Sequence, residues 1–599
     1  MEFRFPVVPF FLSLLAASPL CTDSLMGAGD PSDEEVVVTA NAYPVPFGNL
    51  SRTVTVLTRE EIADLPVHSV PDILAHALSA DVGSRAPFGM QADLRLRGSS
   101  FSQVLVLVDG VRLNDSQTGH HNTDIPVPMD EIERIEVLLG PGSSIYGADA
   151  FGGTVNIITR GFRPGAGAGV RLGMHGLAEG SLSAGFEKGA LRQSFSVTAG
   201  RSSGFRPDRD SRGVTLSARS RIGNSTTLAV SHADREFGAD GFYGPAPSRE
   251  WTSQTLVSVS RSREAAAGIR VDVRGWYRTH GDRFLYDVRS PGLFESRHRT
   301  HAAGASARAR VSLADAAALT LGGEAGADWI ASGTLGDHSF SKTSLFAELE
   351  WSALKRAAVY PGLRFDHYSN FGSAVSPSLS GSLWATPRIR LRSSIGRAFR
   401  IPTFTELHYR DPNHEASPRL GPERAWSAEL GADFIPAADW LGSLTLFSRR
   451  ETGVIDWIRS APEEKWRTAN IRSLRTEGIE IGLRHALGPR AGLETRYSLI
   501  ASDAGSVDYV SKYVLDYARH GWVTALHFPL PLGLRSRQSF RYKRRADGRG
   551  YWILDGALEK AFPRFTLAVE GTNLLDSGYQ EIRGVDMPGR WLGISVRTR

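Results

Sequence analysis

From residue 165 onward, apolar and polar side chains alternate in stretches of roughly ten residues that are separated by breaks. In the segments 479–484 and 565–570, for example, every second residue is Ile, Leu, Val or Phe. This alternation predicts β-strands with one apolar face and one polar face. A soluble sandwich turns the apolar face inward and a membrane barrel turns it outward, so the alternation alone fits both.

The breaks between these stretches are alternately short and long, which favours the membrane barrel. Outer-membrane barrels have tight turns at one rim and long loops at the other, whereas a soluble propeller or solenoid gives no reason for every second break to be short. Ten short turns and eleven loops predict 22 antiparallel strands over residues 165–599. The short breaks lie at 187–190, 223–225, 263–267, 314–316, 353–356, 385–387, 434–437, 485–489, 528–532 and 561–563, and the longest of the others at 236–250, 281–297, 399–421, 459–468, 502–516 and 573–588.

Residues 46–160 have a different pattern, which predicts a small α/β domain ahead of the barrel. The segment 104–108 is a fully apolar strand, 60–79 has helical turns interrupted by Pro66 and Pro71, and 130–139 is a second apolar segment. The lumen of a 22-stranded barrel is too wide to be filled by its own side chains. We therefore expect this domain to plug the lumen.

The N-terminus predicts export. An apolar run at 7–17 follows Arg4, which is typical of a secretory signal peptide, and we place the signal peptide at 1–28. No run of 18 apolar residues occurs, so membrane-spanning helices are excluded. Cys21 is the only cysteine, so the mature chain is expected to contain neither disulfides nor cysteine zinc sites.

Charge and composition exclude several function classes. The net charge is +5, but the basic residues are interleaved with acidic ones and form no patch, so nucleic-acid binding is not expected. No HExxH, GxxxxGK or GxSxG motif occurs, and no catalytic residues, metal site or cofactor are predicted. The chain is therefore not expected to be an enzyme.

Several segments, in the order in which the family has them, resemble motifs of the TonB-dependent outer-membrane transporters. They are Glu34, Glu35, Val36, Val37, Val38, Thr39 and Ala40, which resemble the Ton box; 105–111 and 140–147, which resemble plug motifs; 150–158, which resembles the closing strand of the plug; and 399–407 and 573–576, which resemble barrel motifs.

This resemblance implies a 22-stranded antiparallel transmembrane β-barrel in the outer membrane of a Gram-negative bacterium, with an α/β plug domain in its lumen. It divides the chain into a signal peptide (1–28), the Ton box and a linker (29–45), the plug (46–160) and the barrel (165–599). The implied function is active uptake of a scarce, large ligand by a monomer, energised by the TonB complex of the inner membrane and periplasm.

The Val-rich segment 36–39 has a physical property that fits the Ton box. A short extended segment can add itself as a strand to the exposed sheet edge of a partner through backbone hydrogen bonds. The alternative interpretation is an ordinary first strand of the plug.

The plug motif departs from the family at one position. The family commonly has an arginine before the Gly-Pro of this motif, where this chain has Leu139. Arg97 is the candidate to replace it in an ion pair with barrel glutamates, which would lock the plug to the barrel.

Loops facing the outside carry the candidate ligand-binding residues. They are rich in hydrogen-bonding side chains, which either bind a large polar ligand or hold the plug apex together. The candidates are Pro87, Phe88, Met90, Gln91, Asn114, Asp115, His120, His121 and Asn122 at the plug apex, and His408, Tyr409 and His414 in a barrel loop.

The resemblance to the cobalamin-receptor branch favours a corrinoid or a ferric siderophore as the ligand, with haem as the alternative. Haem iron would need an axial imidazole, for which His120, His121, His408 and His414 are the candidates. A passive porin or a surface adhesin is the alternative of another class. An open pore, however, needs neither a plug nor a Ton box.

Overall fold

The computed structural model describes residues 40–354, 356–505 and 508–598. The predicted signal peptide and residues 34–39 of the predicted Ton box lie outside the described residues. Ala40 of that segment is described and is buried. No helix in the described part of the chain is long and apolar enough to cross a membrane.

Residues 165–598 form a closed antiparallel barrel of 22 long strands, which confirms the predicted fold class. The strands follow one another in chain order, and β33 pairs with β8 to close the barrel. The long strands are β8 (Gly165–Gly173), β9 (Leu177–Lys188), β10 (Leu191–Ser202), β11 (Ser211–Ile222), β12 (Thr226–Gly238), β13 (Arg249–Ala266), β14 (Ile269–Leu285), β15 (Glu295–Ala314), β16 (Ala317–Ser332), β17 (His338–Leu354), β18 (Ala357–Tyr368), β19 (Gly372–Thr386), β20 (Ile389–Arg400), β22 (Glu423–Phe434), β23 (Trp440–Arg459), β24 (Trp466–Gly488), β25 (Ala491–Asp503), β27 (Ala518–Leu530), β28 (Leu534–Arg545), β29 (Gly550–Ala561), β30 (Phe565–Thr572) and β33 (Trp591–Thr598).

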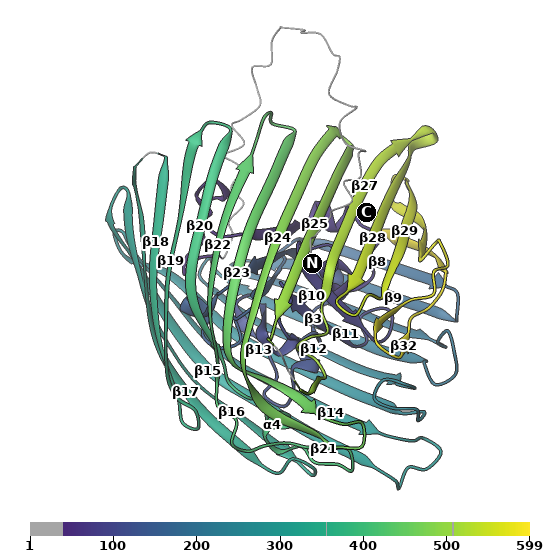
Figure 1. The fold of residues 1–599 in the computed structure, drawn as a ribbon. Helices are drawn as coiled ribbons and strands as arrows, with labels where there is room; N and C mark the ends of the chain where they lie inside the picture. The colour runs from purple at the N-terminus through teal and green to yellow at the C-terminus, as the bar shows by residue number, and fades with distance from the viewer. Residues whose placement is uncertain (1–39, 355, 506–507, 599) are drawn as a thin grey trace, which may run out of the picture.

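The two ends of the barrel differ in the length of their connections. At one end, which we call the turn rim, the connections are tight; β15 and β16, for example, are separated only by residues 315–316. At the other end, the loop rim, the connection from β20 to β22 contains α4 (Phe404–His408) and β21 (His414–Glu415). Other loop-rim connections contain β26 (Val510–Ser511), β31 (Gln580–Ile582) and β32 (Val585–Asp586). Figure 1 shows α4 and β21 at the lower end of the barrel and β32 at the right-hand side.

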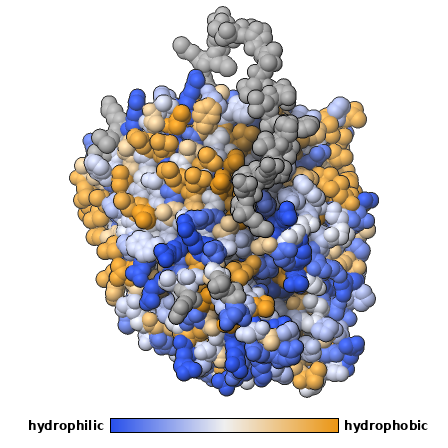
Figure 2. Space-filling model, in the orientation of Figure 1, coloured by the Kyte–Doolittle hydropathy of each residue, from blue (hydrophilic) through white to orange (hydrophobic). Residues whose placement is uncertain are grey.

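The apolar face of the strands points outward, as expected for a barrel in a membrane. In β22, Glu429 is 7% exposed and points into the lumen, while the adjacent Leu430 is 60% exposed on the outer face. Figure 2 shows hydrophobic side chains gathered in the upper part of the view, while the lower end, where the loop rim lies, is mostly hydrophilic. This arrangement is the reverse of a soluble sandwich.

The plug lies inside the barrel and is built around a five-stranded sheet of order β1-β6-β7-β4-β5 (Figure 1). Strand β4 is wholly apolar and buried, and apolar side chains of β4, β6 and β7 pack with α2 and the β2–β3 hairpin into one hydrophobic core. The plug elements are η1 (Phe47–Asn49), β1 (Val54–Thr58), α1 (Arg59–Asp64), α2 (Val70–Leu74), β2 (Ala80–Ser84), β3 (Ala92–Leu96), η2 (Phe101–Gln103), β4 (Val104–Val108), β5 (Val111–Arg112), η3 (Gly119–His121), η4 (Met129–Glu131), β6 (Ile132–Leu139), α3 (Ser143–Tyr146) and β7 (Gly153–Thr159).

The two prolines of the predicted helical region act differently. Pro66 lies between α1 and α2, as expected of a residue that ends helices. Pro71 is within the first turn of α2, where the missing N–H removes no helical hydrogen bond, so it does not interrupt the helix. Ser69 begins α2 by accepting a hydrogen bond from the backbone N–H of Asp72.

The arrangement of the rims predicts which residues face the outside of the cell. We expect Leu293→Cys, in the loop between β14 and β15, to react on intact cells with a thiol reagent that does not cross the outer membrane. Asp315→Cys, in the turn between β15 and β16, should stay unlabelled until the cells are broken. Both sites are exposed, so equal labelling of the two on intact cells would contradict this orientation.

Candidate functional site

The first apex loop, residues 85–91, joins β2 to β3 and contacts the loop rim of the barrel. Phe88 lies edge-on against Trp591, the first residue of β33, with the ring centroids 4.9 Å apart. Gln91 donates a hydrogen bond to the hydroxyl of Tyr243, a loop-rim residue that is 46% exposed. Met90 packs beside Phe242 and Val585, in a cluster formed by the plug and two barrel loops. This side of the plug apex therefore borders a partly exposed aromatic surface.

The second apex loop, residues 114–124, uses several of its polar side chains to hold itself together. The amide of Asn114 accepts a hydrogen bond from the N–H of Val106 at 2.8 Å and donates to the carbonyl of Val104 at 2.9 Å. Asn122 accepts from the N–H of Asp115 at 3.1 Å. These contacts match the second of the two roles that the sequence left open, internal support of the apex. Ligand contact by these residues stays a prediction.

The ring of His120 lies beside the aromatic residues of the plug and of a barrel loop. It stacks on Phe101, with the centroids 4.3 Å apart, and lies 5.7 Å from the ring of Tyr513. Its Nδ1 is 2.7 Å from the carboxylate of Asp93, which Arg85 also contacts at 3.0 Å. Burial lowers the pKa of His120 despite this carboxylate.

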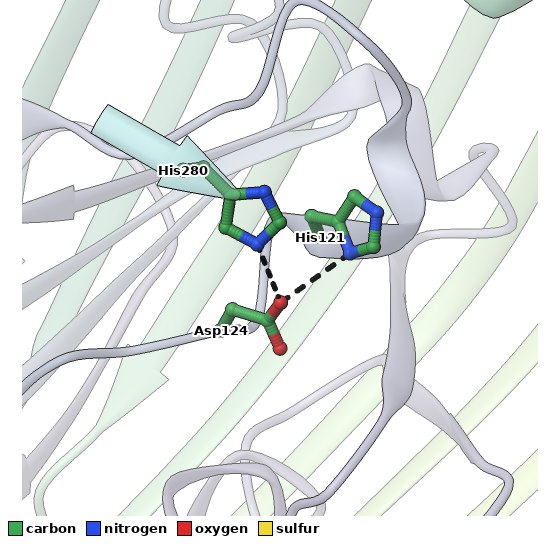
Figure 3. Close-up of side chains that lie close together, drawn as sticks. All are labelled: His121, Asp124 and His280. Carbon is green, nitrogen blue, oxygen red and sulfur yellow. Dashed lines mark hydrogen bonds and ion pairs between the residues drawn. The ribbon is translucent and has the colours of Figure 1, made fainter. Parts of the chain in front are cut away.

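His121 and Asp124 of the plug meet His280 of β14, as Figure 3 shows. One oxygen of Asp124, Oδ2, is 3.0 Å from Nε2 of His280 and 3.3 Å from Nδ1 of His121. The other nitrogen of His121 lies 3.5 Å from Asp282. Burial opposes a charge on His121, but its hydrogen bonds to Asp124 and Asp282 outweigh burial and raise its pKa well above the usual value.

Asp115 anchors the same loop to the barrel wall. Its Oδ2 accepts hydrogen bonds from Arg278 of β14 and from the hydroxyl of Thr300 of β15, both at 2.6 Å. Burial works against ionisation of Asp115, but the Arg278 guanidinium and neighbouring histidines hold the pKa of its carboxyl well below the usual range. Asp115 is therefore an ionised contact between plug and barrel.

The three candidates in the barrel loop lie in or next to α4 and β21. His414 is held from both sides: its Nδ1 is 3.0 Å from Asp411, and Lys512 donates to its Nε2 at 2.9 Å. Tyr409 donates to the same Asp411 carboxylate at 3.0 Å. The imidazole of His408 makes no hydrogen bond with the described residues, and it stacks on His338 with the centroids 3.7 Å apart. Burial, followed by the neighbouring His338, lowers the pKa of His408.

Arg97 lies buried between the plug and two barrel strands. Its guanidinium makes a bidentate contact with Glu480 of β24, at 2.8 and 2.7 Å, and a third contact with Glu429 of β22 at 2.6 Å. The ring of Phe447 covers it at 4.4 Å. Burial opposes the charge on Arg97, but Glu480 and Glu429 raise its pKa. Arg97 thus occupies the position expected of a plug–barrel lock, a role that stays a prediction.

Two residues close to the predicted site are not predicted from the sequence. Asp124 ends the second apex loop, where the sequence shows it only as one acidic residue in a polar stretch. His280 lies in the half of strand β14 that is nearer the loop rim, and no local signal in the sequence indicates that its side chain reaches the plug. Only the docking of the plug against β14 brings His280 to His121.

Comparison with known proteins finds matches to both parts of the chain. Residues 179–574 match the family described as "TonB dependent receptor-like, beta-barrel", and residues 48–154 match "TonB-dependent Receptor Plug Domain". A vitamin B12 transporter from Photobacterium profundum is 26% identical over 511 residues, which cover 80% of each chain. A vitamin B12 transporter from Vibrio vulnificus is 27% identical over 78% of this chain and 79% of its own.

Solved structures share the fold at lower identity. The siderophore receptor PirA from Acinetobacter baumannii superposes with a TM-score of 0.75 at 16% identity, covering 92% of this chain and 98% of its own. The FrpB iron transporter from Neisseria meningitidis also has a TM-score of 0.75, at 14% identity, over 92% and 99% of the two chains. At these identities the likeness concerns the fold alone.

Proposed function

Because this chain belongs to the TonB-dependent receptor family, we propose that it takes up a corrinoid actively across the outer membrane in which such receptors reside. The family and the relatives are transporters and receptors, and they work with TonB. The proposal of a corrinoid as the ligand rests on the match, over about four-fifths of both chains, to two proteins named as vitamin B12 transporters.

The histidines of the apex and of the barrel loop support a ligand that needs no axial donor. A corrinoid already saturates its metal and requires only hydrogen bonds and apolar contact. His121 is buried, and the ring nitrogens of His120 and His414 contact carboxylates or Lys512. A ferric siderophore also saturates its own metal. The preference for a corrinoid over a siderophore therefore rests only on the similarity to the two vitamin B12 transporters.

The lumen argues against a passive pore. The plug sheet and its core occupy the interior of the barrel (Figure 1), and Arg97 and Asp115 tie it to the wall through buried ion pairs. A pore open at rest needs no such domain. Transport past the plug must therefore be accompanied by movement or partial unfolding of the plug. The outer membrane has no ATP to drive this change.

Binding of cyanocobalamin to the purified full-length protein tests the ligand. We expect Tyr243→Ala to weaken binding by about 0.5–1.5 kcal/mol, roughly two- to thirteenfold, because the exposed ring would be lost from the surface beside the plug apex. Tyr497→Ala is the matched control, since Tyr497 lies on the barrel wall beside His520. If the purified protein does not bind cyanocobalamin but binds a ferric siderophore, the corrinoid proposal is contradicted.

Haem remains the second candidate because of one histidine. Of the four candidate histidines, His408 alone has a ring that makes neither a hydrogen bond nor an ion pair with the described residues, and its lowered pKa favours the neutral form, which ligates iron. We expect no tight haem binding. If a six-coordinate haem spectrum does appear and is lost in His408→Ala but kept in His414→Ala, haem replaces the corrinoid as the ligand.

A further inference from the structure

We propose that His121 and Asp124 of the plug, together with His280 of the barrel wall, bind a divalent metal ion of the zinc type. We call these three residues the His121 cluster. They come from two separate parts of the chain, so a bound ion would bridge the plug and strand β14 (Figure 3). This site is independent of the ligand proposed above.

The ligand atoms of the His121 cluster are already spaced for a small ion. Around a tetrahedral Zn²⁺ ion with bonds of about 2.0–2.1 Å, neighbouring ligand atoms lie roughly 3.3 Å apart. Here Oδ2 of Asp124 is 3.0 Å from Nε2 of His280 and 3.3 Å from Nδ1 of His121. All three ligand atoms lie within 4.8 Å of one another. Small side-chain rotations therefore suffice to coordinate an ion.

The second ring nitrogen of each histidine, which would not touch the ion, is directed toward a carboxylate, and the second oxygen of Asp124 is directed toward an arginine. The second nitrogen of His121 is 3.5 Å from Asp282, while Nδ1 of His280 is 3.7 Å from Asp115 and makes no hydrogen bond with the described residues. Metal-bound histidines typically have a carboxylate behind them, which fixes the ring and makes the ligating nitrogen more basic. The second oxygen of Asp124 is held by Arg235 at 2.9 Å, which leaves Oδ2 free for the ion.

Buried polar atoms near the His121 cluster that form no hydrogen bonds to described residues are a second observation that supports a bound ion with its water. Gln254 of β13 is paired directly opposite His280 across the two strands, on the same inner face. Its side chain is buried, yet neither its amide nitrogen nor its amide oxygen has a hydrogen-bond partner among the residues that the structure describes. Oδ1 of Asp282 is also buried and makes no hydrogen bond within the described part of the chain. Buried polar groups are rarely left unpaired, and a metal-bound water would give these atoms a partner.

Carboxyl groups outnumber guanidinium groups around the His121 cluster. Asp115, Asp282 and Glu250 lie around the cluster in addition to Asp124, and all four are buried or nearly so, while Arg235 and Arg278 supply the opposing charges. The second possible group, His121 with Glu250 and Asp282, shares the same imidazole.

The choice of donors narrows the class of ion. Two imidazole nitrogens and one carboxylate oxygen suit zinc and its first-row neighbours, whereas Ca²⁺ and Mg²⁺ prefer sites made of oxygen atoms. The bridge between plug and wall would hold the second apex loop against β14. Movement of this loop during transport would then require release of the ion or of one of its ligands.

Metal binding is measured on the full-length receptor, purified in detergent without a histidine tag and stripped with a chelator. We expect the wild type to bind one equivalent of Zn²⁺. Co²⁺ in its place should give the visible absorption bands of a low-coordinate site with nitrogen ligands. Loss of a metal ligand should cost more than the roughly 10- to 100-fold in affinity that is typical for loss of an outer-shell partner. Both His280→Gln and His121→Gln should therefore lose the stoichiometric site.

The control is His367→Gln, which changes an exposed histidine of β18 outside the cluster and should bind zinc as the wild type does. Because the cluster is buried, each variant is first checked for a folded plug by its thermal unfolding without metal. Gln254→Leu adds a milder change, which should weaken Zn²⁺ binding without removing a proposed ligand. Zinc binding that is absent from the folded wild type, or equally tight in the folded His280→Gln and His121→Gln variants, would overturn the proposal.

Discussion

Cells that express the Val37→Pro variant should fail to accumulate the ligand, although the variant protein binds it as the wild type does. Val37 lies in the segment that resembles the Ton box, and its proposed role is to add a strand to the sheet edge of a periplasmic partner. Proline removes a backbone hydrogen-bond donor from that strand. Uptake should fall to the level of cells without TonB, because no other energy source reaches the receptor.

The matched control is Val37→Ile, which keeps the backbone donor and the preference for an extended strand. This variant should transport normally. Binding is measured on whole cells at low temperature and uptake at growth temperature, so that the two steps are separated. Accumulation by Val37→Pro at the wild-type rate would show that 34–40 is not the energy-coupling segment, and would favour an ordinary plug strand there.

Arg97→Met should loosen the attachment of the plug to the barrel. It leaves Glu429 and Glu480 buried without their cationic partner, and breaking a buried ion pair from one side typically costs about 3–5 kcal/mol. Plug unfolding in urea, followed by hydrogen exchange of plug amides while the barrel stays closed, measures the change. We expect the plug to unfold at a clearly lower urea concentration.

Two comparisons show whether the effect comes from the buried charges. Arg163→Met removes an arginine from an exposed ion pair with Glu133, which is 4.0 Å long, and should cost less than about 1 kcal/mol. Combining Arg97→Met with Glu429→Gln and Glu480→Gln should recover part of the lost stability, because the unpaired charges are then gone. An Arg97→Met plug as stable as the wild type would exclude Arg97 as the lock.

The fold was predictable because its signals are local and repeated. Alternation of apolar and polar residues sets the faces of each strand, and the contrast between short and long breaks sets the rims. The predicted turns agree with the observed ones to within a few residues, and the strand number is correct. The fully apolar segment 104–108 is the buried strand β4. The prediction for Pro71 is wrong, since position within a helical turn decides whether a proline interrupts it.

The candidate site was only partly predictable, because its contacts join segments far apart in the sequence. The resemblance identified Arg97. The glutamates that form ion pairs with it lie in β22 and β24, and the sequence did not single them out. No metal site was expected, because His121 and His280 have no characteristic spacing and meet only when the plug docks. Histidines of the apex and the barrel loop were candidates for a ligand by composition alone. Their partners, Asp93 and Lys512 among them, depend on the folded loops.

Accumulation of labelled cyanocobalamin by cells that lack their own corrinoid receptor tests the central claim most directly. Expression of this chain should restore accumulation when TonB is present, and the same cells without TonB should bind cyanocobalamin at the surface but fail to concentrate it. No accumulation despite a folded receptor in the outer membrane, or equal accumulation with and without TonB, would contradict active corrinoid uptake by this protein.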